Sequence, residues 1–196
     1  VDGAYSGSTK PKYYDDGTSL PGDVYNLAWN GTTQQIIDGF NAGRFLVIHR
    51  DHGSPGAWSS PWFRWSNIYG DDQATPDPKI NNGALLPLVL SVNCASGMFD
   101  DETSGGAMGA PVDFEYLVER FIRSANGGAI GVLGDTRNSP STANSLLLQG
   151  FLDALWPNAL PSFGGSKATP RIGDILVHGK NYLSTQTGNY GDVKQQ

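Results

Sequence analysis

The stretch Phe45-Leu46-Val47-Ile48-His49-Arg50-Asp51-His52-Gly53-Ser54 runs from four apolar residues directly into two histidines and a glycine. A second stretch, Leu85-Leu86-Pro87-Leu88-Val89-Leu90-Ser91-Val92, is mostly apolar and leads into Asn93-Cys94. A third, Ala129-Ile130-Gly131-Val132-Leu133-Gly134, leads into Asp135. Apolar runs without polar alternation are typical of strands buried on both faces, as in parallel sheets.

Helical patterns separate these three strands. Thr32 is a capping residue for a helix that Gly43 ends, and amphipathic or apolar helices are predicted over 113–125, 141–156 and about 172–183. Strands joined through helices form parallel sheets with right-handed crossovers. The sequence therefore predicts an α/β fold, a three-layer α/β/α sandwich with a mainly parallel sheet.

Length and composition indicate one domain. The chain has 196 residues, and we expect an irregular segment over residues 1–30 that packs on a domain formed by residues 31–196. A net charge of -6 disfavours nucleic acid as a partner, and no apolar run is long enough to span a membrane. The chain begins at Val1, so a removed signal or an upstream domain is expected before it.

The only cysteine and a His-Gly pair follow two of the predicted strands. Functional groups collect at the carboxyl ends of parallel strands, so Cys94 and His52 are expected to lie close together. An imidazole beside a thiol draws off its proton and prepares it for nucleophilic attack. Gly53 suits an oxyanion hole because its N–H can approach a reacting carbonyl without a side chain in the way, and the amide of Cys94 is the natural second donor.

Other interpretations of these residues stay open at this point. A lone cysteine after an apolar strand is commonly a buried structural residue. A metal site would use His49, His52 and Cys94, but strand alternation turns the two histidines to opposite faces, and a structural zinc ion needs four ligands. A serine hydrolase is disfavoured because the chain holds no Gly-x-Ser-x-Gly elbow.

The two blocks resemble the gingipain family of cysteine peptidases, which belongs to the caspase-like clan. The hallmark of that family is an apolar strand leading to Gly-His-Gly-Ser and a second leading to Asn-Cys. This chain carries His52-Gly53-Ser54, with Trp58 shortly after, and Asn93-Cys94 followed by Phe99. The resemblance covers about residues 30–185 and implies a caspase-like fold.

The resemblance also implies a role for each matching residue. Cys94 would be the nucleophile, His52 its acid–base partner, and the amides of Gly53 and Cys94 the oxyanion donors. The chain departs from the family at Asp51, which stands where a glycine is usual. Strand alternation is expected to turn Asp51 away from His52, although it could crowd the site or bind a cation.

A second departure is the insertion over residues 100–110, which is expected to form a surface loop near the nucleophile. Its acids Asp100, Asp101 and Glu102 are calcium candidates, because structural calcium occurs in the family. A solvated acidic loop is the favoured interpretation. No cofactor is required for the chemistry, and no metal site is firmly assigned.

The resemblance places part of the substrate pocket in the loop after the third strand. That loop holds Asp135 and Arg137. If Asp135 points into the pocket, a basic side chain before the scissile bond is preferred; if Arg137 does, an acidic one is preferred. Trp58 is a third pocket candidate, and with Trp62 and Trp65 it would also suit an exposed recognition surface.

The favoured hypothesis is a cysteine endopeptidase, a hydrolase that cleaves peptide bonds through a thioester acyl-enzyme. A catalytically inactive binding module of the same fold and a transpeptidase that uses the same two residues are the alternatives. The resemblance implies a secreted or cell-surface bacterial protein whose partner is a protein or peptide substrate. It covers only the second of two subdomains usual in the family, so other domains of a longer precursor are expected.

Overall fold

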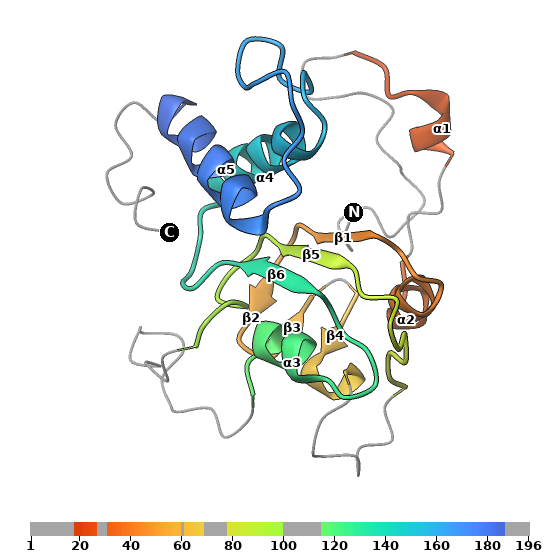
Figure 1. Ribbon diagram of the computed structural model, residues 1–196. Helices are drawn as coiled ribbons and strands as arrows, with labels where there is room; N and C mark the ends of the chain where they lie inside the picture. Colours follow the sequence, from red (N-terminus) through yellow and green to blue (C-terminus); the bar gives the residue numbers. More distant parts are fainter. Residues whose placement is uncertain (1–17, 27–30, 60, 69–77, 100–114, 187–196) are drawn as a thin grey trace.

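A three-stranded parallel sheet lies between the helices of the protein (Figure 1). The computed structural model describes residues 18–26, 31–59, 61–68, 78–99 and 115–186. Strands β1 (Leu46–His49), β5 (Leu88–Ser91) and β6 (Gly131–Gly134) pair in the order β1-β5-β6. All three predicted strands are therefore confirmed, and β5 lies between the strands that precede and follow it.

Helices cover both faces of this sheet (Figure 1). Helices α4 (Ser141–Leu155) and α5 (Ile172–Gln186) pack on one face, while α2 (Thr33–Asn41) and α3 (Leu117–Arg123) lie on the other. A short α1 (Gly22–Tyr25) precedes them in the chain.

Two apolar clusters form the core, one on each face of the sheet. Val89 of β5 points into one cluster and its neighbours Leu88 and Leu90 point into the other, as the period of a strand requires. The first cluster consists of Ile37, Phe40, Trp58, Phe63, Ile68, Ile80, Val89, Leu117, Phe121 and Ala129. The second consists of Leu88, Leu90, Val92, Ala143, Leu147, Phe151, Ala154, Ile175 and Leu183.

A small antiparallel sheet follows β1 and was not expected from the sequence. It consists of β2 (Gly53–Ser54), β3 (Ala57–Trp58) and β4 (Phe63–Arg64), and a 3-10 helix (Trp65–Asn67) follows it. Strands of two residues are too short to show an apolar alternation, so periodicity could not reveal them. This sheet matters for the site because its first strand begins at Gly53.

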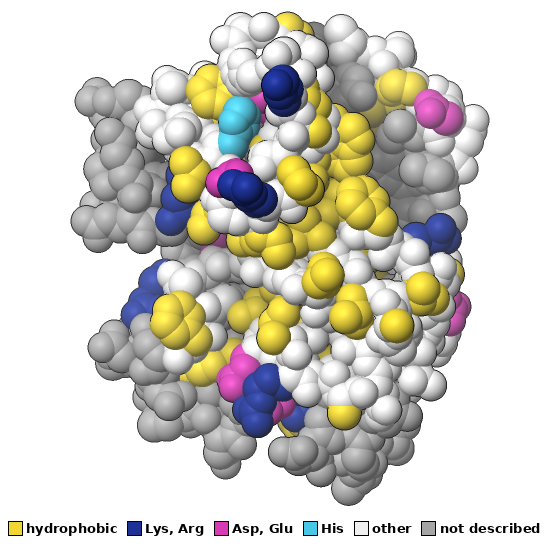
Figure 2. All heavy atoms as spheres, viewed as in Figure 1, with side chains coloured by type: hydrophobic (Ala, Val, Ile, Leu, Met, Phe, Trp, Pro, Cys, Tyr) yellow, Lys and Arg dark blue, Asp and Glu magenta, His cyan; other side chains and the backbone are white. Residues whose placement is uncertain are grey.

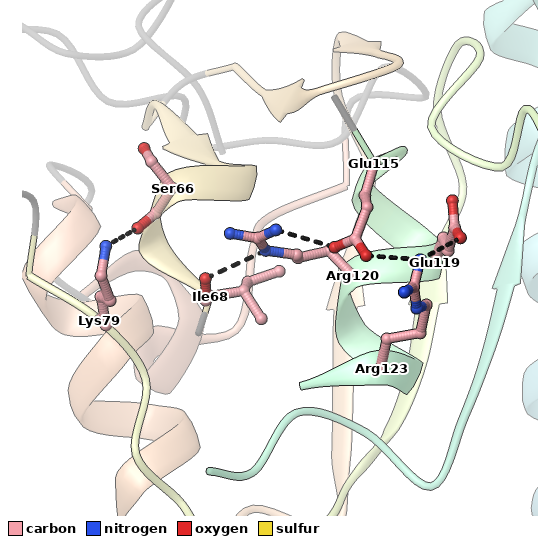
Figure 3. Close-up of polar contacts among 7 residues, drawn as sticks. All are labelled: Ser66, Ile68, Lys79, Glu115, Glu119, Arg120 and Arg123. Carbon is pink, nitrogen blue, oxygen red and sulfur yellow. Dashed lines mark hydrogen bonds and ion pairs between the residues drawn. The ribbon is translucent and has the colours of Figure 1, made fainter. Parts of the chain in front are cut away.

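A buried arginine fixes the start of α3 (Figure 3). Arg120 is 4% exposed; its Nη1 lies 2.8 Å from a carboxylate oxygen of Glu115, and its Nε donates to the carbonyl of Ile68. Its guanidinium also lies 5.2 Å from the ring centroid of Trp65. Arg123 pairs with the other carboxylate oxygen of Glu115 at 2.6 Å, so one carboxylate receives two guanidinium groups.

The predicted helices are confirmed, with one difference in length. Thr32 caps α2 and forms a capping box with Gln35. The helix expected over 113–125 occupies only Leu117–Arg123 among the described residues. Glu115 and Tyr116 precede it in non-helical conformation, and the Leu117 amide donates to the carbonyl of Pro55 in the β2–β3 turn.

Several sequence expectations concern residues outside the described ranges. The irregular segment expected over 1–30 is described only at 18–26, and the domain division stays a prediction. Among the described residues, no helix is long and apolar enough to cross a membrane.

Apolar side chains are exposed where the strands of the parallel sheet begin. Phe45 precedes β1 and is 64% exposed, and Ile130 precedes β6 and is 69% exposed. Leu85 and Leu86, before β5, are also exposed, as is Trp156, whose ring meets that of Phe45 edge to face. Figure 2 shows apolar side chains exposed across the middle of the face that it presents. This apolar end lies opposite the carboxyl ends of the strands, where the candidate site is found.

Candidate active site

The carboxyl ends of β1 and β5 bring the two sequence blocks together. His49, the last residue of β1, is paired in register with Ser91, the last residue of β5. The two following segments meet again at Gly53. A β-carbon at position 53 would lie 2.6 Å from Cγ of Asn93 and 2.9 Å from the carbonyl oxygen of Cys94, so the backbone at Gly53 packs directly on the Asn93-Cys94 segment.

Cys94 begins a tight turn after β5. Its side chain is half-buried, and its Sγ lies 3.6 Å from the carbonyl oxygen of Ser139. The next residue, Ala95, has a φ of 55°, a left-handed conformation that is uncommon for a residue other than glycine. Ala95 is fully buried, and packing holds this conformation in place.

The loop after β6 holds this turn through two backbone hydrogen bonds. The amide of Ala95 donates to the carbonyl of Arg137 at 3.0 Å, and the amide of Gly97 donates to the carbonyl of Asp135 at 2.9 Å. Gly97 also packs against the backbone of Gly134, where a β-carbon would lie 2.6 Å from the carbonyl carbon. The position of Cys94 therefore depends on the loop formed by residues 135–139.

The side chain of His52 is exposed, whereas its backbone amide and carbonyl are both hydrogen-bonded. Its amide donates to Oδ1 of Asp51 at 2.6 Å, and its carbonyl accepts from the amide of Ser59 at 3.0 Å. The carboxylate of Asp51 thus accepts from the backbone amide of the next residue, while its predicted orientation away from the His52 ring stays a prediction. The departure from the family glycine thus has a local structural use.

The amide of Gly53 is not bonded within the small antiparallel sheet. His52 and Ser59 form a hydrogen-bonded pair, and bonded and non-bonded pairs alternate along an antiparallel ladder. Gly53 and Trp58 are therefore a non-bonded pair, and the amide of Gly53 is directed away from β3. The Gly53 amide is thus left without a partner in β3, and its role as an oxyanion donor stays a prediction.

A buried polar cluster lies directly beneath these residues. The ring of His49 stacks on Trp58 with centroids 4.7 Å apart, and its Nδ1 lies 2.8 Å from Nδ2 of Asn93. Nε1 of Trp58 donates to Oγ of Ser91 at 2.7 Å, and Ser91 in turn bonds Ser96. Burial lowers the pKa of His49 to about 4, and the charge of Arg50 acts in the same direction.

The sequence did not reveal the role of this cluster. The sequence pattern indicates His49 only as a zinc candidate, and Asn93 only as part of the Asn-Cys block. The available signal was a second histidine at the end of a strand whose other residues are apolar. Its partners could not be known before the register of β1 and β5 was known.

The three pocket candidates lie in different environments. Trp58 is 1% exposed and belongs to the core, so its assignment to a substrate pocket or an exposed recognition surface is wrong. Asp135 is buried, accepts a hydrogen bond from Ser139, and lies near Asn144. Arg137 is exposed, and its Nη1 donates to the carbonyl of Thr136. Of the three tryptophans in this region, Trp62 is exposed, at 57%.

Burial raises the pKa of Asp135 to about 6, and the hydrogen bonds from Ser139 and Asn144 oppose that shift. A cavity of about 380 Å³ borders Asp135 and runs along β6. Its polar lining includes Thr136 and Lys180, and the rest of its lining is mostly apolar. Neither Cys94 nor His52 lines this cavity.

No metal site emerges from the part of the chain that the structure describes. No group of three or more His, Cys, Asp or Glu residues there is placed to hold a metal ion. His49 uses both ring nitrogens in contacts with protein groups, which leaves none for the zinc site considered from the sequence. The calcium candidates Asp100, Asp101 and Glu102 lie outside the described residues.

The fold of this chain is similar to that of solved structures. The crystal structure of the Arg-specific cysteine proteinase gingipain R (RgpB) matches with a TM-score of 0.63 and 18% identity over 83% of this chain and 32% of that chain. A complex of the Porphyromonas gingivalis RgpB pro- and mature domains matches with a TM-score of 0.61 and 17% identity, over 83% of this chain and 34% of that one. The chain thus spans about a third of the length of these solved chains.

The sequence comparisons give a family and no individual relative. No curated protein sequence matches the chain. The model of Peptidase family C25 matches residues 3–196, which is nearly the whole chain. That match and the shared fold confirm the gingipain resemblance, and the chain belongs to Peptidase family C25.

Proposed function

We propose that this chain carries the catalytic centre of a cysteine endopeptidase with a caspase-like, three-layer α/β/α fold. One observation carries the proposal: the backbone at Gly53 packs on Asn93 and Cys94, so that the segment bearing His52 adjoins the cysteine. The exposed ring of His52 and the half-buried thiol of Cys94 are then the acid–base group and the nucleophile.

The proposed reaction proceeds in two steps. His52 takes the proton of the Cys94 thiol, the sulfur attacks the peptide carbonyl, and the amides of Gly53 and Cys94 stabilise the oxyanion. His52 then protonates the leaving amine, and a thioester remains on Cys94. Water, deprotonated by His52, hydrolyses the thioester and releases the acid and the free thiol.

The loop after β6 supports a preference for an acidic side chain before the scissile bond. Arg137 is exposed, and its carbonyl is bonded to the residue after Cys94. Asp135 is buried and already accepts a hydrogen bond from Ser139, so it is poorly placed to meet a basic substrate side chain. We therefore assign substrate selection to Arg137.

The location, the kind of substrate, the longer precursor and the calcium site are inferred from the family. We propose that it is a secreted or cell-surface bacterial hydrolase that acts on protein substrates as part of a longer precursor. Calcium bound by residues 100–102 would be structural, and the chemistry itself needs no cofactor.

Thiol labelling and peptide cleavage test the proposal together. Iodoacetamide should label Cys94 rapidly near neutral pH, and His52→Ala should abolish the rapid reaction, whereas His178→Gln, a change on α5, should not. The protein should cleave a peptide library after acidic residues, Cys94→Ala should remove the activity, and Arg137→Ala should remove the acidic preference. A slow thiol that His52→Ala leaves unchanged would contradict the assignment and favour a binding module, and an amide product in place of an acid would show a transpeptidase.

A further inference from the structure

His49 joins the two segments that carry the proposed catalytic pair. It is the last residue of β1, and it stands three positions before His52. Its ring is buried and lies parallel to the indole of Trp58, at an interplanar angle of 2°. The ring can therefore make hydrogen bonds only at its edge, through its two nitrogens.

The partners of the two nitrogens fix which one carries the proton. Nε2 lies 3.2 Å from the carbonyl oxygen of Ser59, and a carbonyl only accepts, so Nε2 carries the hydrogen. Nδ1 lies 2.8 Å from the amide nitrogen of Asn93, which donates to the remaining lone pair. A neutral ring with its proton on Nε2 satisfies both partners, and burial keeps His49 neutral by lowering its pKa to about 4.

Each of these two bonds leads to one member of the proposed pair. Ser59 accepts the bond from His49, and its amide donates to the carbonyl of His52 at 3.0 Å. Asn93 donates to His49 and immediately precedes Cys94. A single imidazole thus connects the backbone of His52 with the backbone of Cys94.

We infer that His49 is a positioning residue that sets the distance between the His52 ring and the Cys94 thiol. The inference rests on the proposed function, since it concerns the same two residues. It differs from an ordinary core role in its consequence. A residue that served only the core would change the reactivity of the Cys94 thiol only as far as its loss unfolds the protein. A positioning role predicts that loss of the two hydrogen bonds changes this reactivity in the folded protein as well.

Two substitutions separate the hydrogen bonds from the packing. His49→Phe keeps an aromatic ring to stack on Trp58 but removes both hydrogen bonds. His49→Gln loses the stack but supplies one amide donor and one amide acceptor. His178→Phe is the matched control: His178 also bonds a buried side chain, that of Asp153 at 2.9 Å, but it lies on α5, and the cavity that it lines with Asp153 includes no residue of the segments of His52 and Cys94.

The measurement is the rate of Cys94 alkylation by iodoacetamide as a function of pH, together with melting temperature. We expect His49→Phe to slow alkylation near neutral pH about tenfold, because the thiol is no longer held at the right distance from the His52 ring. His49→Gln should recover part of that loss. His178→Phe should lower the melting temperature and leave the alkylation profile unchanged.

The outcomes distinguish this inference from the proposed function. If the wild-type thiol is fast and depends on His52, but His49→Phe alkylates like the wild type, the positioning role is wrong and the proposed function stands. If the wild-type thiol is already slow, the proposed function itself is wrong. Should His49→Phe fail to fold, nitrogen-15 NMR of the wild-type histidines replaces it: a His49 ring that is protonated, or that carries its proton on Nδ1 near neutral pH, would overturn the inference.

Discussion

The backbone at Gly53 lies against the side-chain amide of Asn93, with no room for a methyl group between them. Gly53→Ala should therefore cost about 1–3 kcal/mol of stability, because backbone as well as side-chain atoms must move. It should also slow alkylation of Cys94, since it forces the segments of His52 and Cys94 apart. Chemical denaturation and iodoacetamide labelling measure the two effects.

A second glycine provides the control for that experiment. Gly39 lies inside α2, and nothing is within 4 Å of the place where its β-carbon would be. Gly39→Ala should stabilise the protein by up to about 1 kcal/mol through helix propensity and leave thiol labelling unchanged. Equal effects of the two substitutions would contradict the close approach at Gly53.

Two arginines that share one carboxylate should differ sharply in their contribution to stability (Figure 3). Arg120→Ala removes a buried guanidinium together with its contacts to Ile68 and Trp65, and should cost roughly 3–5 kcal/mol. Arg123→Ala should lower the free energy of unfolding by at most about 1 kcal/mol, because the side chain of Arg123 is 56% exposed. Urea denaturation of the two variants checks this order, and a larger loss at Arg123 would contradict it.

The pH dependence of stability should contain two opposing contributions. The pKa of His49 falls from its ordinary value of 6.5 to about 4, so the unfolded chain takes up this proton first and stability is lost as pH falls from about 6.5 to 4. The pKa of Asp135 rises from 3.8 to about 6, so stability is lost as pH rises between those values. Each contribution is on the order of 3 kcal/mol, and they offset each other between about pH 4 and 6.

Asp135→Asn should reveal the contribution of His49. Without the carboxyl group at position 135, the free energy of unfolding should decrease steadily from about pH 6.5 to 4, more steeply than in the wild type. His49→Gln should show the opposite slope in the same interval, because only Asp135 then contributes. Parallel curves for the three proteins would show that neither group has the shifted pKa described above.

The α/β pattern could be predicted because its signals are local. The runs around Val47, Val89 and Val132 are apolar on both faces of a strand, and Thr32 is a capping residue followed by helical spacing. These features depend on a few consecutive residues. Their elements therefore appear in the structure within a few residues of the expected bounds.

The candidate site could be predicted only in part, because its remaining features depend on register. That the segments of His52 and Cys94 meet was expected from strand order, and the packing at Gly53 agrees with it. The burial of Trp58 and the bond of His49 to Ser59 arise from the β2–β3 hairpin, which packs against β1. Two-residue strands leave no pattern in the sequence, so these contacts could not be foreseen.

The carbonyls of Asp135 and Arg137 hold the turn that carries Cys94, and the same short loop presents Arg137 at the surface. Under the proposed function, this one loop thus determines both the substrate selectivity and the position of the reactive Cys94. A new substrate preference can arise through side-chain exchange at Arg137, because its carbonyl stays in place. Insertions or deletions in the loop would shift the nucleophile as well, so engineering a new preference here calls for a loop of unchanged length.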